Sequence, residues 1–104
     1  MGQESGETVF DELRGIIAPI ARRHGMERIY LFGSRSRGDN REDSDYDLCI
    51  AAPDGFDLFD LEHFLRDLRE ALNADIDVVS EKRIAKDSFF GEEILRDRMM
   101  LFEA

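Results

Sequence analysis

Hydrophobic residues recur every three or four positions in two stretches of the chain, and this spacing predicts two amphipathic helices. The first helix starts at Phe10 and ends near His24 and Gly25. Pro19 falls inside it and removes one backbone hydrogen bond, so we expect a kink or a restart there. The second helix covers residues 58–72, where leucines alternate with charged residues and mark one buried face.

Shorter apolar runs predict β-strands between and after these helices. Residues 29–32 form a continuous apolar run, the pattern of a strand that is covered on both faces. Residues 47–51 form a second strand, and residues 75–79 form a third in which polar and apolar side chains alternate. The tail predicts a helix over about residues 88–97 and a short extended piece over residues 99–102.

The order helix, strand, strand, helix, strand, helix predicts a small α/β or α+β domain. We expect a mixed sheet of three or four strands with helices mainly on one face. With 104 residues, of which 42% are hydrophobic, the chain has room for one modest core. Residues 1–8 are predicted to be a flexible start and residues 9–104 a single domain.

Charge and cysteine content narrow the class of protein. The formal net charge of -10 argues against broad nucleic-acid binding and against attachment to an anionic membrane, because both need a basic surface. The single cysteine, Cys49, lies in an apolar run and is predicted to be a buried core residue. The sequence shows no signal-peptide pattern and no apolar segment of membrane-spanning length, which predicts a cytoplasmic protein.

A glycine-serine pair follows the first predicted strand directly. Gly33 allows a sharp turn that exposes successive backbone N–H groups, and the Ser34 hydroxyl adds a donor, so the pair suits phosphate oxygens. Arg35 and Arg37 follow, and their guanidinium groups are predicted to contact a triphosphate, Arg35 ahead of Arg37. A Gly-Ser pair alone is an ordinary turn, so its meaning depends on the residues downstream.

Three aspartates supply the candidate chemistry. Asp45 and Asp47 are two residues apart at the start of a strand, so both carboxylates project from one face and can share metal ions. Asp77 lies in the third strand, and if that strand neighbours the second, its carboxylate joins the pair. We expect two Mg²⁺ ions to be held there, with Asp77 also able to accept a proton from an attacking hydroxyl. Asp75 lies on the same face and is the alternative to Asp77.

Gly33-Ser34, ten intervening residues and Asp45-x-Asp47 together resemble the signature of the polymerase-β-like nucleotidyltransferases. The stretch LFGSRSRGDNREDSDYDLCI is similar to the compact members called minimal nucleotidyltransferases. The later IDVVS, with Asp77, matches the place where that family carries its third carboxylate, and the ending EILRDRMMLFEA also resembles it. The resemblance extends from about Phe10 to the C-terminus.

This resemblance implies an enzyme that uses ATP and Mg²⁺ to move AMP to a hydroxyl group and releases pyrophosphate. Many such small proteins resemble the antitoxin of a two-gene module whose toxin is a HEPN ribonuclease, and some silence the toxin by adenylylating a tyrosine on it. A HEPN-type toxin is therefore the expected partner. A non-catalytic binding antitoxin or scaffold is one alternative, and nucleotidyl transfer to a small molecule or to RNA is another, although the charge of -10 disfavours it.

The remaining candidate residues are given structural roles. His24 and His63 are predicted to be surface residues, since neither has a second histidine at ligand spacing. The chain has more phenylalanines than a small core easily covers, so some form either a partner surface or a satellite cluster. The residues in question are Phe56, Phe59, Phe64, Phe89 and Phe90.

Overall fold

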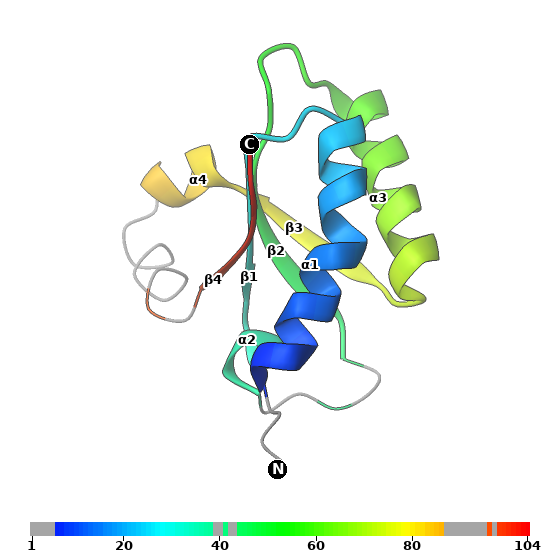
Figure 1. The fold of residues 1–104 in the computed structure, drawn as a ribbon. Helices are drawn as coiled ribbons and strands as arrows, with labels where there is room; N and C mark the ends of the chain where they lie inside the picture. The colour runs from blue at the N-terminus through cyan, green and yellow to red at the C-terminus, as the bar shows by residue number, and fades with distance from the viewer. Residues whose placement is uncertain (1–5, 39–40, 42–43, 87–95, 97) are drawn as a thin grey trace.

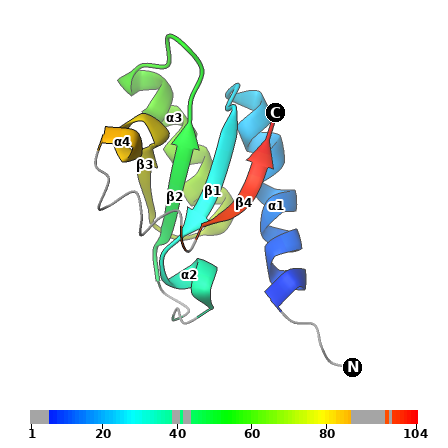
Figure 2. The same cartoon turned by 90° about the vertical axis from the view of Figure 1, so that its left-hand side faces the viewer.

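The computed structural model describes residues 6–38, 41, 44–86, 96 and 98–104. Within this part of the chain, four helices and four strands build a small α+β domain (Figures 1 and 2). The elements are α1 (Gly6–Arg23), β1 (Arg28–Phe32), α2 (Ser34–Arg37), β2 (Tyr46–Ala51), α3 (Leu58–Leu72), β3 (Ile76–Ser80), α4 (Glu81–Lys86) and β4 (Met99–Glu103). The predicted fold class is confirmed.

The four strands form one mixed sheet in the order β3-β2-β1-β4. β1 is antiparallel to both β2 and β4, whereas β2 and β3 are parallel. Helices α1 and α3 cover one face of the sheet and contact each other, while the short α4 lies on the opposite side (Figure 1). The α1–α3 side is therefore the covered face, and the other side is called the open face below.

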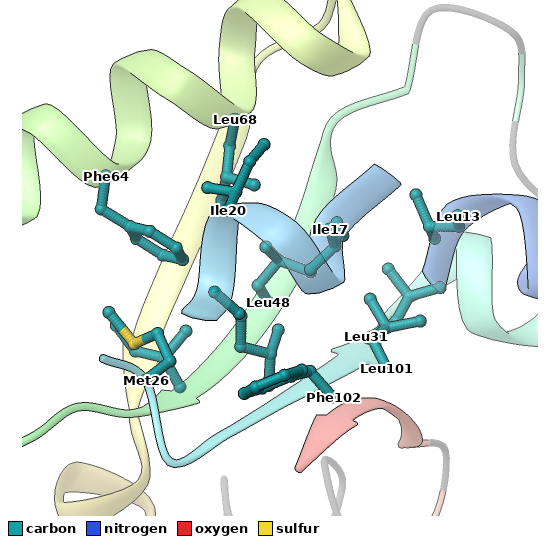
Figure 3. Close-up of a cluster of buried hydrophobic side chains, with 13 residues drawn as sticks. Leu13, Ile17, Ile20, Met26, Leu31, Leu48, Phe64, Leu68, Leu101 and Phe102 are labelled. Atoms are coloured by element: carbon teal, nitrogen blue, oxygen red, sulfur yellow. The ribbon is translucent and has the colours of Figure 1, made fainter. Parts of the chain in front are cut away.

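The hydrophobic core fills the space between the covered face and the two long helices (Figure 3). Side chains from α1 and α3 meet alternate side chains of the strands, because successive strand residues point to opposite faces. The fully buried members with the largest side chains are Phe64, Ile17, Met26, Ile29, Leu31, Leu48 and Leu68. A smaller buried pair, Tyr30 and Cys49, packs on the open face.

The predicted boundaries hold for α3 and, to within one residue at each end, for the strands, and they differ more for α1. α1 begins at Gly6, ahead of the predicted start at Phe10, and it continues without a break through Pro19. The predicted restart is therefore wrong. A proline crowds the carbonyl of the residue four positions earlier, which here is Gly15. Pro19 and Gly15 are both exposed, so this disturbance lies on the solvent side of α1. Packing of the buried side keeps the helix continuous.

Helix α3 covers residues 58–72 as predicted, but its leucine face is only partly buried: Leu68 is fully buried, whereas Leu58 is 78% exposed. The two ends of the helix are locally specified. At the start, the Asp57 carboxylate accepts from the Asp60 backbone N–H, and the Asp60 carboxylate accepts from the Asp57 N–H, which is a capping box. At the end, Asn73 adopts a left-handed conformation with φ of 52°. α4 was not predicted, and the helix predicted over residues 88–97 lies almost entirely outside the described residues.

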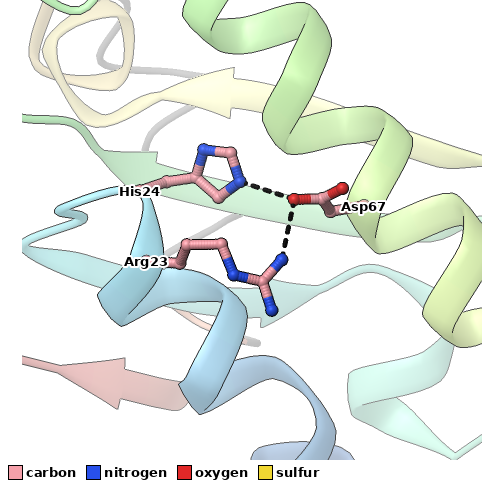
Figure 4. Close-up of polar contacts among 3 residues, drawn as sticks. All are labelled: Arg23, His24 and Asp67. Atoms are coloured by element: carbon pink, nitrogen blue, oxygen red, sulfur yellow. Dashed lines mark hydrogen bonds and ion pairs between the residues drawn. The ribbon is translucent and has the colours of Figure 1, made fainter.

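The prediction that His24 is a surface residue is wrong. Its side chain is only 14% exposed, its Nε2 donates to Asp67 Oδ2 at 2.8 Å, and its ring packs edge-on against Phe64. Arg23 donates to the same oxygen at 3.0 Å (Figure 4). The cluster ties the end of α1 to α3. His63 is exposed, as predicted.

The phenylalanines divide between core and surface. Phe64 is fully buried, Phe56 packs against the core, and Phe59 is 77% exposed. Phe89 and Phe90 lie outside the described residues. Cys49 is buried, as predicted, and burial raises the pKa of its thiol to about 11. No helix in the described part of the chain combines the length and hydrophobicity needed to cross a membrane.

Candidate active site

The start of β2 carries two of the three predicted carboxylates. Asp45 precedes the strand and is exposed, and Asp47 lies within the strand and is half-buried. Tyr46 stands between them and packs against the main core, so its ring is on the covered face. Because strand side chains alternate, the carboxylates of Asp45 and Asp47 belong to the open face.

Asp77 is brought beside this pair by the parallel pairing of β2 and β3. The register sets Asp77 directly against Asp47, and neighbouring strands lie about 4.8 Å apart. Asp75 precedes β3, and its backbone carbonyl accepts from the Tyr46 N–H at 3.0 Å. The charge of Asp77 acts on Asp47, and Asp75 is not among the groups that shift the pKa of Asp47. The structure therefore places Asp77, and not Asp75, directly opposite Asp47, while the role of Asp77 as the third carboxylate stays a prediction.

Gly33 brings the glycine-serine turn against the same carboxylates. Its φ is +79°, a left-handed conformation that glycine adopts without steric cost. A Cβ added at Gly33 would overlap the Asp47 carboxylate, whose Cγ would lie 3.2 Å away. Pairing of Phe32 with Asp47 explains this closeness, because Gly33 directly follows Phe32. Two sequence features separated by ten residues thus meet at one point.

A short helix follows the glycine. The Gly33 carbonyl accepts from the backbone N–H groups of Ser36 and Arg37, at 3.1 and 3.3 Å, and from the Ser36 hydroxyl at 2.9 Å. These bonds start α2 at Ser34. The position of the Ser34 side chain lies outside what the structure describes, so its predicted phosphate contact stays a prediction.

The carboxylates repel one another. Burial, followed by the charges of Asp77 and Asp45, raises the pKa of the Asp47 carboxyl above its ordinary value. The positive charge of Arg37 partly offsets this increase in the pKa of Asp47. The site therefore concentrates negative charge that a bound cation would stabilise.

Arg35 and Arg37 lie in different surroundings. The Arg35 guanidinium donates to the Ser44 carbonyl through Nε at 3.1 Å and Nη2 at 2.7 Å, and it stacks on the Tyr46 ring. Arg37 is exposed, and its charge acts on Asp47. The predicted ranking, with Arg35 ahead of Arg37 as a phosphate contact, finds no support in this geometry. The part played by Ser44 and Tyr46 in holding Arg35 carried no recognisable signal in the sequence.

The three aspartates fit a magnesium ion that also takes ligands from water and substrate, and they do not fit a metal that the protein encloses alone. Among the residues that the structure describes, no three His, Cys, Asp or Glu side chains lie close enough together to hold a metal ion. Asp47 and Asp77 are register partners on adjacent strands and Asp45 lies two residues before Asp47, so the three aspartates are an open edge and not a complete set of metal ligands. Magnesium keeps several water ligands and is commonly bound by one or two carboxylates together with substrate phosphates. An open edge of this kind suits a metal that arrives with a nucleotide.

Fold and site together define a class: a small α+β domain in which a Gly-Ser turn meets carboxylates on two adjacent strands. Residues 16–104 match the sequence family described as Polymerase beta, Nucleotidyltransferase. The chain belongs to this nucleotidyltransferase family, and the predicted resemblance is confirmed.

Individual relatives agree with this assignment. The chain is 31% identical over 90 residues to MJ0435 of Methanocaldococcus jannaschii, which is named provisionally as a protein adenylyltransferase; the match covers 86% of this chain and 89% of the relative. A solved structure described provisionally as a minimal nucleotidyltransferase is 33% identical with a TM-score of 0.73, covering 95% of this chain and 98% of the other.

A third similarity concerns the fold alone. A Shewanella oneidensis complex, described as a tri-AMPylated HEPN toxin with its MNT antitoxin, contains a chain that matches at 20% identity with a TM-score of 0.62. The match covers 96% of this chain and 74% of the other.

Proposed function

We propose that this nucleotidyltransferase transfers AMP from ATP to a tyrosine hydroxyl of a HEPN-type toxin and so acts as an antitoxin. The observation that carries the chemistry is the meeting of Gly33 and Asp47, with Asp77 in register beside them. The protein acceptor is supported by the name of the M. jannaschii relative and by the AMPylated toxin in the S. oneidensis complex.

In this proposal Asp45, Asp47 and Asp77 would hold two Mg²⁺ ions, which would neutralise charge at the triphosphate and at the attacking oxygen. Backbone N–H groups after Gly33 and the Arg37 guanidinium bind phosphate oxygens. Asp77 accepts the hydroxyl proton as the oxygen forms a bond to the α-phosphorus and the bond to pyrophosphate breaks. The products are the AMP-tyrosine ester, pyrophosphate and one proton.

The direct test is label transfer from α-labelled ATP to the purified toxin in the presence of Mg²⁺. We expect a labelled toxin with the wild-type chain and none with Asp45→Asn or Asp47→Asn. Unchanged labelling by both variants would refute the assignment of these carboxylates. Absence of labelling by the wild-type chain, with ATP bound, would refute the toxin as acceptor.

A binding antitoxin remains the second candidate, and exposed apolar side chains at the start of α3 favour it. Leu58 and Phe59 are 78% and 77% exposed, and Leu58 borders a cleft of about 650 Å³. If complex formation alone neutralises the toxin, Asp47→Asn should protect cells as well as the wild-type chain. If AMP transfer is required, this variant should bind the toxin and fail to protect.

A further inference from the structure

Arg35 makes two contacts at once with the segment that carries the carboxylates. Its Nε and Nη2 both donate to the carbonyl of Ser44, and its guanidinium carbon lies 3.9 Å from the centroid of the Tyr46 ring. Ser44 immediately precedes Asp45, and Tyr46 immediately follows it. One side chain from α2 therefore holds the residues on both sides of Asp45.

The contact lies on the covered face, away from the carboxylates. The Tyr46 ring packs against the main core, and Arg35 and Tyr46 line a hollow of about 190 Å³ together with Phe10, Leu13 and Ile16 of α1. Asp47 has the opposite strand parity and belongs to the open face. Consistent with this, the charge of Arg37 lowers the pKa of Asp47, whereas Arg35 is not among the groups that shift this pKa.

We propose that Arg35 is a positioning residue that fastens Ser44 and Tyr46 from the covered face, so that Asp45 and Asp47 present their carboxylates to the metal-nucleotide in fixed positions. The inference rests on the proposed nucleotidyl transfer. It replaces the predicted phosphate contact of Arg35 and leaves that role to Arg37.

The chemistry of arginine explains why this position needs it. A guanidinium group is planar, so its edge can donate two hydrogen bonds to one carbonyl while its face stacks on an aromatic ring. A lysine ammonium keeps the charge but cannot do both in one geometry. The substitution Arg35→Lys therefore keeps the positive charge and removes the positioning contacts, so its effect distinguishes the two roles.

The experiment compares Arg35→Lys and Tyr46→Leu with the wild-type chain, using Tyr46→Phe as the conservative variant. Since misplaced catalytic groups are costly, we expect Arg35→Lys and Tyr46→Leu to lower kcat by about 10- to 100-fold with KM for ATP little changed. Mn²⁺ binding by the nucleotide-free protein should weaken in both. Tyr46→Phe keeps the ring and should match the wild-type chain in both measurements.

Arg98→Lys is the matched control, because the Arg98 guanidinium stacks in the same way on the ring of the other tyrosine, Tyr30 of β1, at 4.4 Å. It should leave kcat and Mn²⁺ binding unchanged. The chain has only two tyrosines, so ring NMR signals can be assigned with Tyr46→Phe, and Arg35→Lys should shift the Tyr46 signals. Should Tyr46→Leu fail to fold, Arg35→Lys and Arg35→Gln decide the question.

A raised KM for ATP with normal kcat and normal Mn²⁺ binding in Arg35→Lys would show a phosphate ligand and overturn the proposal. So would full activity of both Arg35→Lys and Arg35→Gln. A wild-type chain that neither transfers AMP nor binds Mn²⁺ would instead refute the proposed function. The two failures are therefore distinguishable.

Discussion

At Asp47 the local electrostatics disfavour the ionised carboxylate, whereas the proposed metal binding requires it. Its carboxyl is half-buried, and burial together with the charges of Asp77 and Asp45 raises its pKa. Between the ordinary pKa of about 3.9 and the raised value, the folded state holds more protons than the unfolded state. The free energy of unfolding therefore falls as pH rises through this window, and the full cost is present above the raised pKa.

Asp47→Asn should therefore stabilise the metal-free protein while abolishing nucleotidyl transfer. We expect a gain of roughly 0.5–2 kcal/mol in the free energy of unfolding at pH 7, the range common for substitutions that relieve a functional site. Urea denaturation in EDTA at pH 7 and near pH 3 measures it. The gain should shrink at the lower pH, where the wild-type carboxyl is protonated, and a variant less stable than the wild-type chain at pH 7 would contradict the argument.

Gly33→Ala tests the contact between the turn and the carboxylate. A left-handed φ and overlap with Asp47 should together cost about 1–3 kcal/mol in the free energy of unfolding and displace the Asp47 side chain. Gly55→Ala is the matched control, because Gly55 has a φ of +82° and an added Cβ there meets nothing within 4 Å. Both variants should lose stability, but only Gly33→Ala should lose AMP transfer.

At the scale of elements, the contact between α1 and α3 includes a polar cluster beside the core. Asp67 of α3 accepts from His24 and Arg23 at the end of α1 (Figure 4). The hydrogen bond from His24, and then the charges of His24 and Arg23, lower the pKa of the Asp67 carboxyl. A lowered pKa means that this stabilisation is present above the ordinary pKa of about 3.9 and is lost as pH falls through the folded-state value.

Asp67→Asn should consequently lower Tm at pH 7, and the difference from the wild-type chain should decrease as the pH is taken down to about 3. Thermal unfolding followed by circular dichroism across this range measures it. Asp11→Asn serves as the control, because the ion pair of Asp11 is with Arg14 of the same helix. An equal loss of Tm in both variants would show that the α1–α3 connection has no special importance.

The order of the strands decides which residues share the site. β2 lies between β1 and β3, so the turn after β1 and the aspartate of β3 both reach Asp47. A central strand with a parallel neighbour on one side and an antiparallel neighbour on the other makes this possible. The site is thus a product of sheet topology rather than of any one segment.

For the whole molecule, metal and nucleotide binding should appear as added stability. A ligand that binds only the folded state stabilises it by about 2.7 kcal/mol at a concentration 100 times its Kd. Mg²⁺ with a non-hydrolysable ATP analogue should therefore raise Tm, and EDTA should remove most of the increase. Asp45→Asn with Asp47→Asn should abolish the increase, and an undiminished one would place metal-nucleotide binding elsewhere.

Much of the fold was predictable because its signals are local. The helical spacing in α3, the apolar runs of β1 and β2 and the alternation in β3 reflect which faces are buried, although Leu58 at the start of α3 is exposed. Pro19 misled because a proline on the solvent side of a well-packed helix is tolerated, and solvent exposure is not visible in the sequence. His24 misled for the same reason, since its partner Asp67 lies 43 residues away.

The sequence by itself determined the class of protein and the candidate residues: Gly33, Ser34, the paired aspartates and Asp77. Only the tertiary structure decided which of them meet. It paired Asp47 with Asp77 rather than Asp75, set Gly33 against the carboxylate, and put Arg35 and Arg37 in different surroundings. The physical reason is that motif spacing fixes which residues are available, whereas strand register and the two faces of a sheet fix where each side chain lies.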